Sequence, residues 1–290
     1  MPSWATLWTS RDGAREIESW HMIYEKFFPL KTLKIEGSSA YAASVDLASL
    51  NHLSTALAVL FGPDDAPVCL DVGANIGLTT LLMDQSFKGG RVLAFEPHPV
   101  TFGQMDRNIS ANQTGTNRIE TFNFALGKAD GEVLFRDVDQ YNTGNSFLLE
   151  GSLAAAQDAI RVPVRTLDGF DGTPDHIDLM KIDVEGFELD VLKGAEATLA
   201  RVDTVLIEFN HWCLSSLAHV LPIDALAFIF DTFEGVFVFD LKAKAYVRVQ
   251  TDAQKWSFLH KNMVNFNVND LLCTNSSTVI RRVTAAGKLA

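Results

Sequence analysis

Cysteine is scarce in this sequence, and long apolar runs are missing. The three cysteines, Cys69, Cys213 and Cys273, stand far apart along 290 residues, and no C-x-x-C pair occurs. So few thiols at such spacing predict neither a disulfide framework nor a zinc site, and they are typical of a protein kept reduced in the cytoplasm. No apolar stretch approaches the roughly 20 residues of a membrane-spanning helix, and the first residues lack the pattern of a secretory signal. We therefore expect a cytoplasmic protein that does not insert into a membrane.

Basic residues are also in the minority. The chain has 24 Lys and Arg against 36 Asp and Glu, which gives a formal net charge of −12. This balance argues against non-specific binding to nucleic acid and against an electrostatic attraction to anionic membranes. Apolar residues make up 47% and charged residues 21% of the 290 positions, which is typical of a globular protein with one large domain, or one domain and an extension.

Two parts of different character follow each other along the chain. Apolar residues recur at helical spacing over 17–28 and again over 47–60, with a loop or short ribbon expected around 33–41. The sequence GPDDAP at 62–67 predicts a turn and the boundary between the parts. We therefore expect an N-terminal helical extension over 1–65 and a second domain over 66–290. The extension could cap the sheet edge, form a wall of the substrate pocket, or join two copies in a homodimer.

The second part alternates between strand and helix patterns. Strands are expected at 68–71, 91–96, 119–124, 178–183, 203–209 and 236–240, and helices at 77–86, 99–112, 188–199 and 222–232. Further β segments are expected at 132–135, 160–165, 246–250 and 270–273, and a frayed tail at 281–290. This alternation predicts an α/β fold with a mostly parallel sheet, helices on both faces, and a ligand site beyond the carboxyl ends of the strands.

The stretch VCLDVGANIGLTT (68–80) is central to this pattern. An apolar run ends at Asp71, Gly73 and Gly77 follow, and helical spacing then begins, which indicates a strand, a tight turn and a helix. The dinucleotide fingerprint G-x-G-x-x-G would need glycine at 75 and 78, where this chain has Asn75 and Leu78. An acid at the strand end instead suits a ligand with an ammonium group, such as S-adenosylmethionine. Taken alone, Asp71 could simply cap the turn.

Glu96 supports this interpretation. It ends the second strand, 25 positions after Asp71, and an acid there can accept hydrogen bonds from ribose hydroxyls. Asp183 and Glu208 end two later strands, and parallel strands bring their ends together. We therefore expect these four carboxyls along one edge of the sheet. They exceed what a ribose needs, so some should face a substrate or a cation.

Several motifs together resemble one known family. DVGANIG, AFEPHP, VRTLD and LMKIDVEGFELDVLKGA are similar to those of the FkbM-type S-adenosylmethionine-dependent methyltransferases, over about residues 68–211. The resemblance implies a Rossmann-like class I methyltransferase fold with a seven-stranded sheet. It also implies O-methylation of a hydroxyl on a polyketide or on a sugar. The sequence IEFNHWCL (207–214) resembles members found beside glycosyltransferases, which favours a sugar of a glycan or glycoconjugate.

The resemblance also implies roles for individual residues. Cofactor contacts would come from Asp71, Gly73, Ala74, Asn75 and Gly77 at the methionine part, Glu96 and Pro97 at the ribose, Asn123 and Ala125 near the adenine, and Asp183 beside the methyl donor. Asn145, in the sequence Gly-Asn-Ser, would face the substrate.

Transfer of a methyl group to a sugar hydroxyl benefits from a general base. His211, Asp183 and Glu185 are the candidates, and Glu208 could orient His211 or bind the acceptor. Each has a structural alternative: His211 could pack at the strand end, and Glu185 could cap its helix. A divalent cation held by Asp183, Glu185 and Glu208 is possible, but the sequence shows no full ligand set and we expect none. Three other functions stay open: methylation of a natural-product hydroxyl, a non-catalytic binding protein with this fold, and a dehydrogenase.

Overall fold

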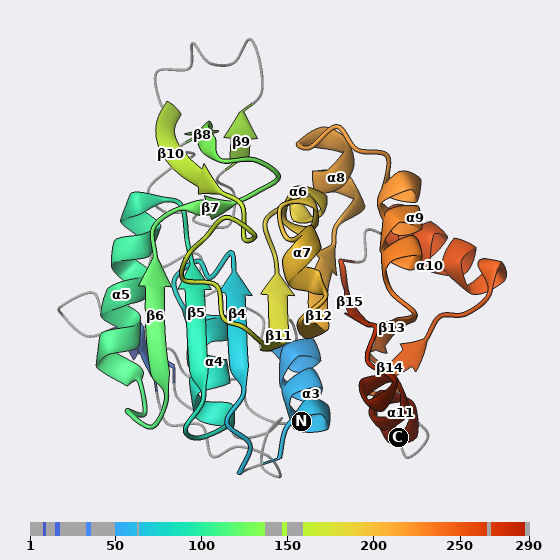
Figure 1. Ribbon diagram of the computed structural model, residues 1–290, viewed down its shortest axis with the longest axis horizontal. Coiled ribbons are helices and arrows are strands. Elements are labelled where there is room, and N and C mark those ends of the chain that lie inside the picture. The colour runs from blue at the N-terminus through green and yellow to red at the C-terminus, as the bar shows by residue number, and fades with distance from the viewer. Residues whose placement is uncertain are drawn as a thin grey trace.

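The largest feature of the fold is an eight-stranded sheet. The computed structural model describes residues 8–9, 15–17, 33–35, 50–62, 64–136, 147–149, 159–265 and 268–287. The strand order is β14-β13-β15-β12-β11-β4-β5-β6 (Figure 1). These strands are β4 (Val68–Val72), β5 (Arg91–Phe95), β6 (Arg118–Phe122), β11 (Ile177–Ile182), β12 (Val202–Phe209), β13 (Gly235–Asp240), β14 (Ala245–Arg248) and β15 (Asn269–Thr274).

Five neighbouring strands, from β12 to β6, run parallel, and β15 pairs antiparallel with both β12 and β13. The predicted large, mostly parallel α/β sheet is therefore confirmed. The eighth strand is β14, which pairs with β13 outside the seven strands expected.

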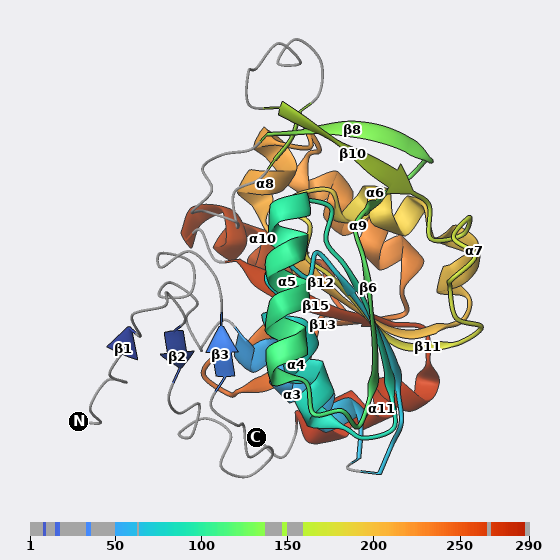
Figure 2. The same ribbon diagram turned by 90° about the vertical axis from the view of Figure 1, so that its left-hand side faces the viewer.

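Side chains alternate between two helix layers because successive residues of a strand point to opposite faces. In β4, Leu70 and Val72 belong to the apolar cluster formed with α6 (Glu188–Lys193), α8 (His211–Ser216), α9 (Pro222–Thr232) and α10 (Asp252–Asn265). Cys69 belongs to the cluster formed with α3 (Asn51–Leu60), α4 (Leu78–Ser86) and α11 (Ser277–Ala286). Figure 2 shows the two layers from the side, with α5 (Pro99–Asn112) beside α4.

A second, four-stranded sheet lies beyond the carboxyl ends of β5 and β6 (Figure 1). Its order is β7-β10-β8-β9, with β7 (Ala125–Leu126), β8 (Gly131–Arg136), β9 (Phe147–Leu149) and β10 (Ala159–Arg165). The β segments expected at 132–135 and 160–165 are thus present. This second sheet therefore lies next to the edge of the main sheet at which the sequence predicts the ligand (Figure 1).

The N-terminal part differs from the prediction. Short strands β1 (Trp8–Thr9), β2 (Arg15–Ile17) and β3 (Leu33–Ile35) form a small antiparallel sheet. Ile17 ends a strand, so the helix expected to begin there is wrong at that residue, and 18–32 lie outside the described residues. Leu53 and Leu57 of α3 pack against the main sheet in the cluster that contains Cys69. The boundary at 65 stays a prediction.

Three further differences lie in the second part. The helix expected over 188–199 is divided into α6 and α7 (Glu196–Leu199) at Gly194, where an added Cβ would lie 1.9 Å from the carbonyl oxygen of Gly127. The expected frayed tail is wrong, since α11 extends to Ala286 and buries Val279 and Val283. The helices α8 and α10 were not predicted.

Candidate functional site

The turn between β4 and α4 is built from left-handed residues. The φ angles of Gly73, Asn75 and Gly77 are 80°, 50° and 89°. The amides of Gly73 and Ala74 both donate to the carbonyl oxygen of Phe95, at 3.0 Å. A Cβ at position 73 would lie 1.8 Å from the carbonyl oxygen of Asp183. Glycine is therefore required there, and the turn directly contacts the backbone that follows β11.

Glu96 is held against this turn. Its Oε2 accepts a hydrogen bond from the Asn75 amide at 3.0 Å, and its Oε1 accepts one from the His98 amide at 2.9 Å. Burial raises the pKa of Glu96 to about 7, although both amides oppose the shift. The Oδ1 atom of Asn75 is buried and has no hydrogen-bond partner among the described residues. A buried acceptor of this kind needs a donor, so it marks a place for a ligand.

The residues predicted near the adenine tie two strand ends together. The Nδ2 atom of Asn123 donates to the carbonyl oxygens of Glu96 and Pro97, each at 2.9 Å. Ala125 begins β7, where it pairs with Val164 of β10. These contacts fix the chain beyond β5 and β6. Asn145 lies outside the described residues.

Asp71 has no exposed surface. Its Oδ2 accepts hydrogen bonds from the Thr79 and Thr80 hydroxyls at 2.7 and 2.6 Å, and its Oδ1 lies 3.4 Å from the Lys181 Nζ. The carboxylate thus fixes the first turn of α4 and forms an ion pair with the ammonium group of Lys181. Sequence reasoning placed a cationic ligand beside this acid and missed Lys181, although Lys181 and Asp71 are paired in the register of β11 and β4.

Three carboxylates gather where β11 and β12 end. Oxygen atoms of Asp183, Glu185 and Glu208 all lie within 4.8 Å of one another. Asp183 Oδ2 is also 3.2 Å from the Lys181 Nζ, and the thiol of Cys213 donates to Glu185 Oε2 at 3.0 Å. Together with the ion pair between Lys181 and Asp71, these contacts bring strand-end acids together as the parallel topology predicts.

This crowding changes the protonation of the cluster. Burial and the neighbouring Asp183 raise the pKa of Glu185 to about 7, against the opposing effect of the Cys213 hydrogen bond and Lys181. Burial, Asp183 and Glu185 raise the pKa of Glu208 well above its usual value, and its Oε2 has no hydrogen-bond partner among the described residues. Burial and the neighbouring acids therefore favour the protonated form of Glu208, and Glu185 can exchange a proton near neutral pH.

The structural alternative for Glu185 is a helix cap, but the N-cap residue of α6 is Phe187 and it makes no side-chain cap hydrogen bond. Glu188 Oε1 accepts hydrogen bonds from the amides of Val184 and Gly186 at 3.3 and 3.0 Å. Glu185 itself has a φ of 53°, which is uncommon outside glycine, and its side chain joins the cluster. The three carboxylates could also contribute oxygen ligands to a divalent cation whose remaining ligands are water. The absence of a metal requirement stays a prediction.

His211 is the first residue of α8. Its Nδ1 lies 3.1 Å from the side-chain oxygen of Asn262 on α10. An amide oxygen only accepts, so Nδ1 donates the hydrogen in this pair. Asn210 caps the helix by accepting from the Trp212 and Cys213 amides. The ring of His211 is therefore held to α10 through Asn262.

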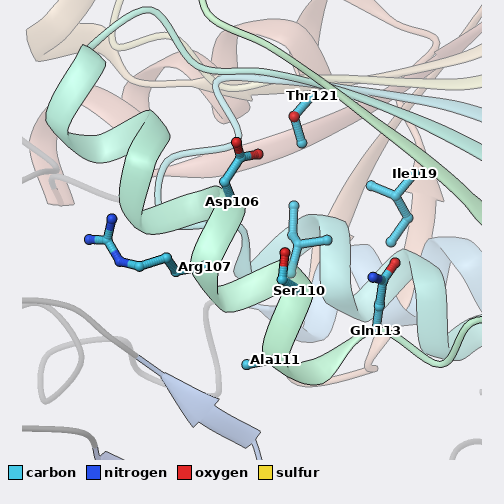
Figure 3. Close-up of a pocket in the computed structure, with 8 residues that line it drawn as sticks. Asp106, Arg107, Ser110, Ala111, Gln113, Ile119 and Thr121 are labelled. Atoms are coloured by element: carbon cyan, nitrogen blue, oxygen red, sulfur yellow. The ribbon is translucent and has the colours of Figure 1, made fainter.

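An open groove lies elsewhere, between α5 and the edge strand β6 (Figure 3). Its lining includes Asp106, Arg107, Ile119 and Thr121. None of the predicted site residues lines it. We therefore assign the site to the carboxyl ends of the strands, where the polar groups converge.

Comparison with known proteins agrees with the motifs. Residues 71–229 match the family model described as "Methyltransferase FkbM domain". The chain belongs to the FkbM methyltransferase family. The matched residues include the turn after β4, Glu96 and the acids at the ends of β11 and β12.

Curated relatives of this FkbM domain include three proteins named as methyltransferases. Methyltransferase 1 of Beauveria bassiana is 30% identical over 166 residues, which cover 50% of this chain and 65% of the relative. Hexuronic acid methyltransferase AglP of Haloferax volcanii is 29% identical over 152 residues, 51% of this chain and 57% of the relative. The 2-O-methyltransferase NoeI of Sinorhizobium fredii is 25% identical over 197 residues, 63% of this chain and 78% of the relative. The chain thus spans less than two thirds of the first two.

The membrane prediction can be compared with the helices of the FkbM protein. Among the helices in the described ranges, none combines the length and the apolar character needed to cross a bilayer. The three cysteines, Cys69, Cys213 and Cys273, are all buried as free thiols.

Proposed function

We propose that this protein is an S-adenosylmethionine-dependent O-methyltransferase that acts on a sugar hydroxyl. Family membership carries the methyl transfer. One observation carries the cofactor proposal. In the turn, the Asn75 amide donates a hydrogen bond to the buried Glu96, and the Oδ1 atom of Asn75 has no donor among the described residues. The turn also lacks the glycines of a dinucleotide fingerprint at 75 and 78, which speaks against a dehydrogenase.

The residues present fit this cofactor. Glu96 would hold the ribose, because each of its oxygens accepts one amide and retains a second lone pair. Gly73, Ala74, Asn75 and Gly77 would border the methionine part. Pro97 would flank the ribose, the adenine would lie near Asn123 and Ala125, and Asp183 would lie at the reactive end. When bound, S-adenosylmethionine supplies a methyl group on a positively charged sulfur.

The acceptor side needs a group that takes a proton. A sugar hydroxyl is a weak nucleophile, and a base with a pKa near the working pH is most effective. Glu185 has such a pKa, about 7, because of burial and the neighbouring Asp183. We assign it as the general base, with the protonated Glu208 as a hydrogen-bond donor and His211 as an acceptor-orienting group. The remaining contribution is positioning, which brings the hydroxyl oxygen in line with the methyl group.

The names of two relatives support a sugar acceptor. One is a hexuronic acid methyltransferase, and the other is a 2-O-methyltransferase, which names oxygen as the methylated atom. A natural-product hydroxyl remains the alternative, and it would be favoured by an apolar pocket formed by the N-terminal extension over 1–65. That extension could equally join two copies of the chain.

Calorimetric titration with S-adenosylhomocysteine tests the cofactor. We expect wild type to bind it and Glu96→Ala to bind more weakly by about 1–3 kcal/mol, the cost of leaving buried ribose hydroxyls unpaired. The matched control is Glu132→Ala, because 63% of the Glu132 side chain is exposed to solvent. Absence of binding to wild type, or tighter binding of NAD, would overturn the proposal.

The acceptor is tested by product formation. Purified protein and S-adenosylmethionine are incubated with hexuronic acids, neutral sugars and aromatic polyols, and released S-adenosylhomocysteine is measured. We expect release with a sugar, without added metal. Release only with the aromatic polyols would establish the natural-product alternative, and release only after a divalent metal is added would contradict the metal-independent reaction.

A further inference from the structure

We propose that Lys181 is a positioning residue that holds Asp183 in place beside the cofactor and ties it to the cofactor turn. This inference rests on the proposed methyl transfer, because it assigns Asp183 to the reactive end. Lys181 lies inside β11, two residues before the acid, and its side chain is only 4% exposed. It occupies none of the positions assigned above to cofactor or acceptor.

The ammonium of Lys181 lies between two strand-end carboxylates. Its Nζ is 3.2 Å from Asp183 Oδ2 and 3.4 Å from Asp71 Oδ1. Register explains the second contact, since Lys181 and Asp71 are paired on adjacent parallel strands and point to the same face. The contact with Asp183 follows from the spacing along the chain. Lys181 and Asp183 are two residues apart at the end of β11, and alternate residues of a strand lie on the same face.

The two carboxylates have different surroundings. Asp71 is completely buried, and its other oxygen holds Thr79 and Thr80 at the start of α4. The Asp183 side chain is 35% exposed, so part of it remains free to meet a ligand. Lys181 therefore links the buried Asp71, which holds the start of α4, to the partly exposed Asp183.

A buried ammonium is costly unless charges of opposite sign surround it. Burial opposes the charge of Lys181, but the carboxylates of Asp183 and Asp71 outweigh it and raise its pKa above the usual value. Lys181 is thus a permanent cation in a group of acids. Such a cation restricts the rotamer of the partly exposed Asp183, whose geometry would otherwise be set by solvent and by the neighbouring Glu185 and Glu208.

A double-mutant cycle between Lys181 and Asp183, read as affinity for S-adenosylhomocysteine, separates positioning from general stabilisation. Lys181→Met alone would leave Asp71 buried and unpaired, which destabilises the fold. The cycle therefore starts from Asp71→Asn, in which that charge is absent. All four proteins carry Asp71→Asn. One has no further change, one adds Lys181→Met, one adds Asp183→Asn, and one adds both. Thermal unfolding confirms that each is folded.

We expect Lys181→Met to weaken binding about tenfold when Asp183 is present and less than about twofold when Asp183→Asn is also present, a coupling typical of residues in direct contact. Equal weakening in both backgrounds would show that Lys181 acts only through general stability, and it would overturn the inference while the proposed function stands. If wild type does not bind S-adenosylhomocysteine, the proposed function fails, and this inference fails with it.

Discussion

Replacement of Gly73 by alanine should damage both the fold and the cofactor turn. Position 73 has a φ of 80°, and an added Cβ would lie 1.8 Å from the carbonyl oxygen of Asp183 and 2.9 Å from its carbonyl carbon. The left-handed backbone alone costs about 1–2 kcal/mol for a residue with a Cβ. Overlap with backbone, which cannot rotate away, adds about 1–3 kcal/mol or more. The total of about 2–5 kcal/mol is a large share of the roughly 5–15 kcal/mol that holds a domain folded.

Gly115→Ala is the matched control for this change. Gly115 has a similar φ of 72°, but nothing lies within 4 Å of the Cβ it would gain. Its replacement therefore costs only the backbone term of about 1–2 kcal/mol. Urea unfolding of the three proteins gives the two free-energy losses, and S-adenosylhomocysteine titration shows whether the turn still binds. Equal losses for Gly73→Ala and Gly115→Ala would refute the conclusion that the strand ends of β4 and β11 are in direct backbone contact.

Three further predictions concern titration and capping. Burial raises the pKa values of Glu96, Glu185 and Glu188 from 4.5 to about 7, so between these values the folded protein holds more protons than the unfolded chain. The free energy of unfolding should therefore fall as pH rises from about 4.5 to 7, and melting temperatures that stay level or increase over this window would contradict it. With an accepted sugar, kcat should rise as pH increases through about 7, because Glu185 then loses its proton and can act as a base. Glu185→Gln should lower kcat by about 10²–10⁴-fold, whereas replacement of the exposed Glu234 by glutamine should change kcat little. Near-normal turnover of Glu185→Gln would remove it as the base. Asp168 caps α7 by accepting from the Ala197 amide at 2.9 Å and from the Thr198 amide at 2.8 Å. Asp168→Asn should cost about 0.5–2 kcal/mol in urea unfolding, more than the exposed Asp171→Asn, and equal midpoints would argue against the cap.

Much of the fold could be predicted because parallel strands are apolar on both faces. The helices expected over 99–112 and 222–232 are α5 and α9 with the same bounds, since each begins with proline in its first turn and carries a regular apolar stripe. The gathering of acids followed from topology alone, because parallel strands end at the same edge.

Other features depend on contacts that no local pattern carries. Lysine is usually exposed, so nothing in the sequence KID marks Lys181 as a buried partner of Asp71. The requirement for glycine at position 194, where the expected helix breaks, comes from the approach of Gly127, a residue far away in the chain. For α11 the information was present, as Val279 and Val283 are spaced by one helical turn, and the polar residues between them concealed it.

The position of β15 has a consequence for how the protein is made. This strand comes late in the chain but lies inside the sheet, between β12 and β13, and Asp270 is paired in register with Glu208. While a ribosome is still synthesising the segment before Asn269, β12 presents an unpaired edge at the residues of the candidate site. Pairings of this kind between distant parts of a sequence slow folding. A nascent chain that stalls before Asn269 should therefore be a client for chaperones, because the β12 edge beside Glu208 is still unpaired.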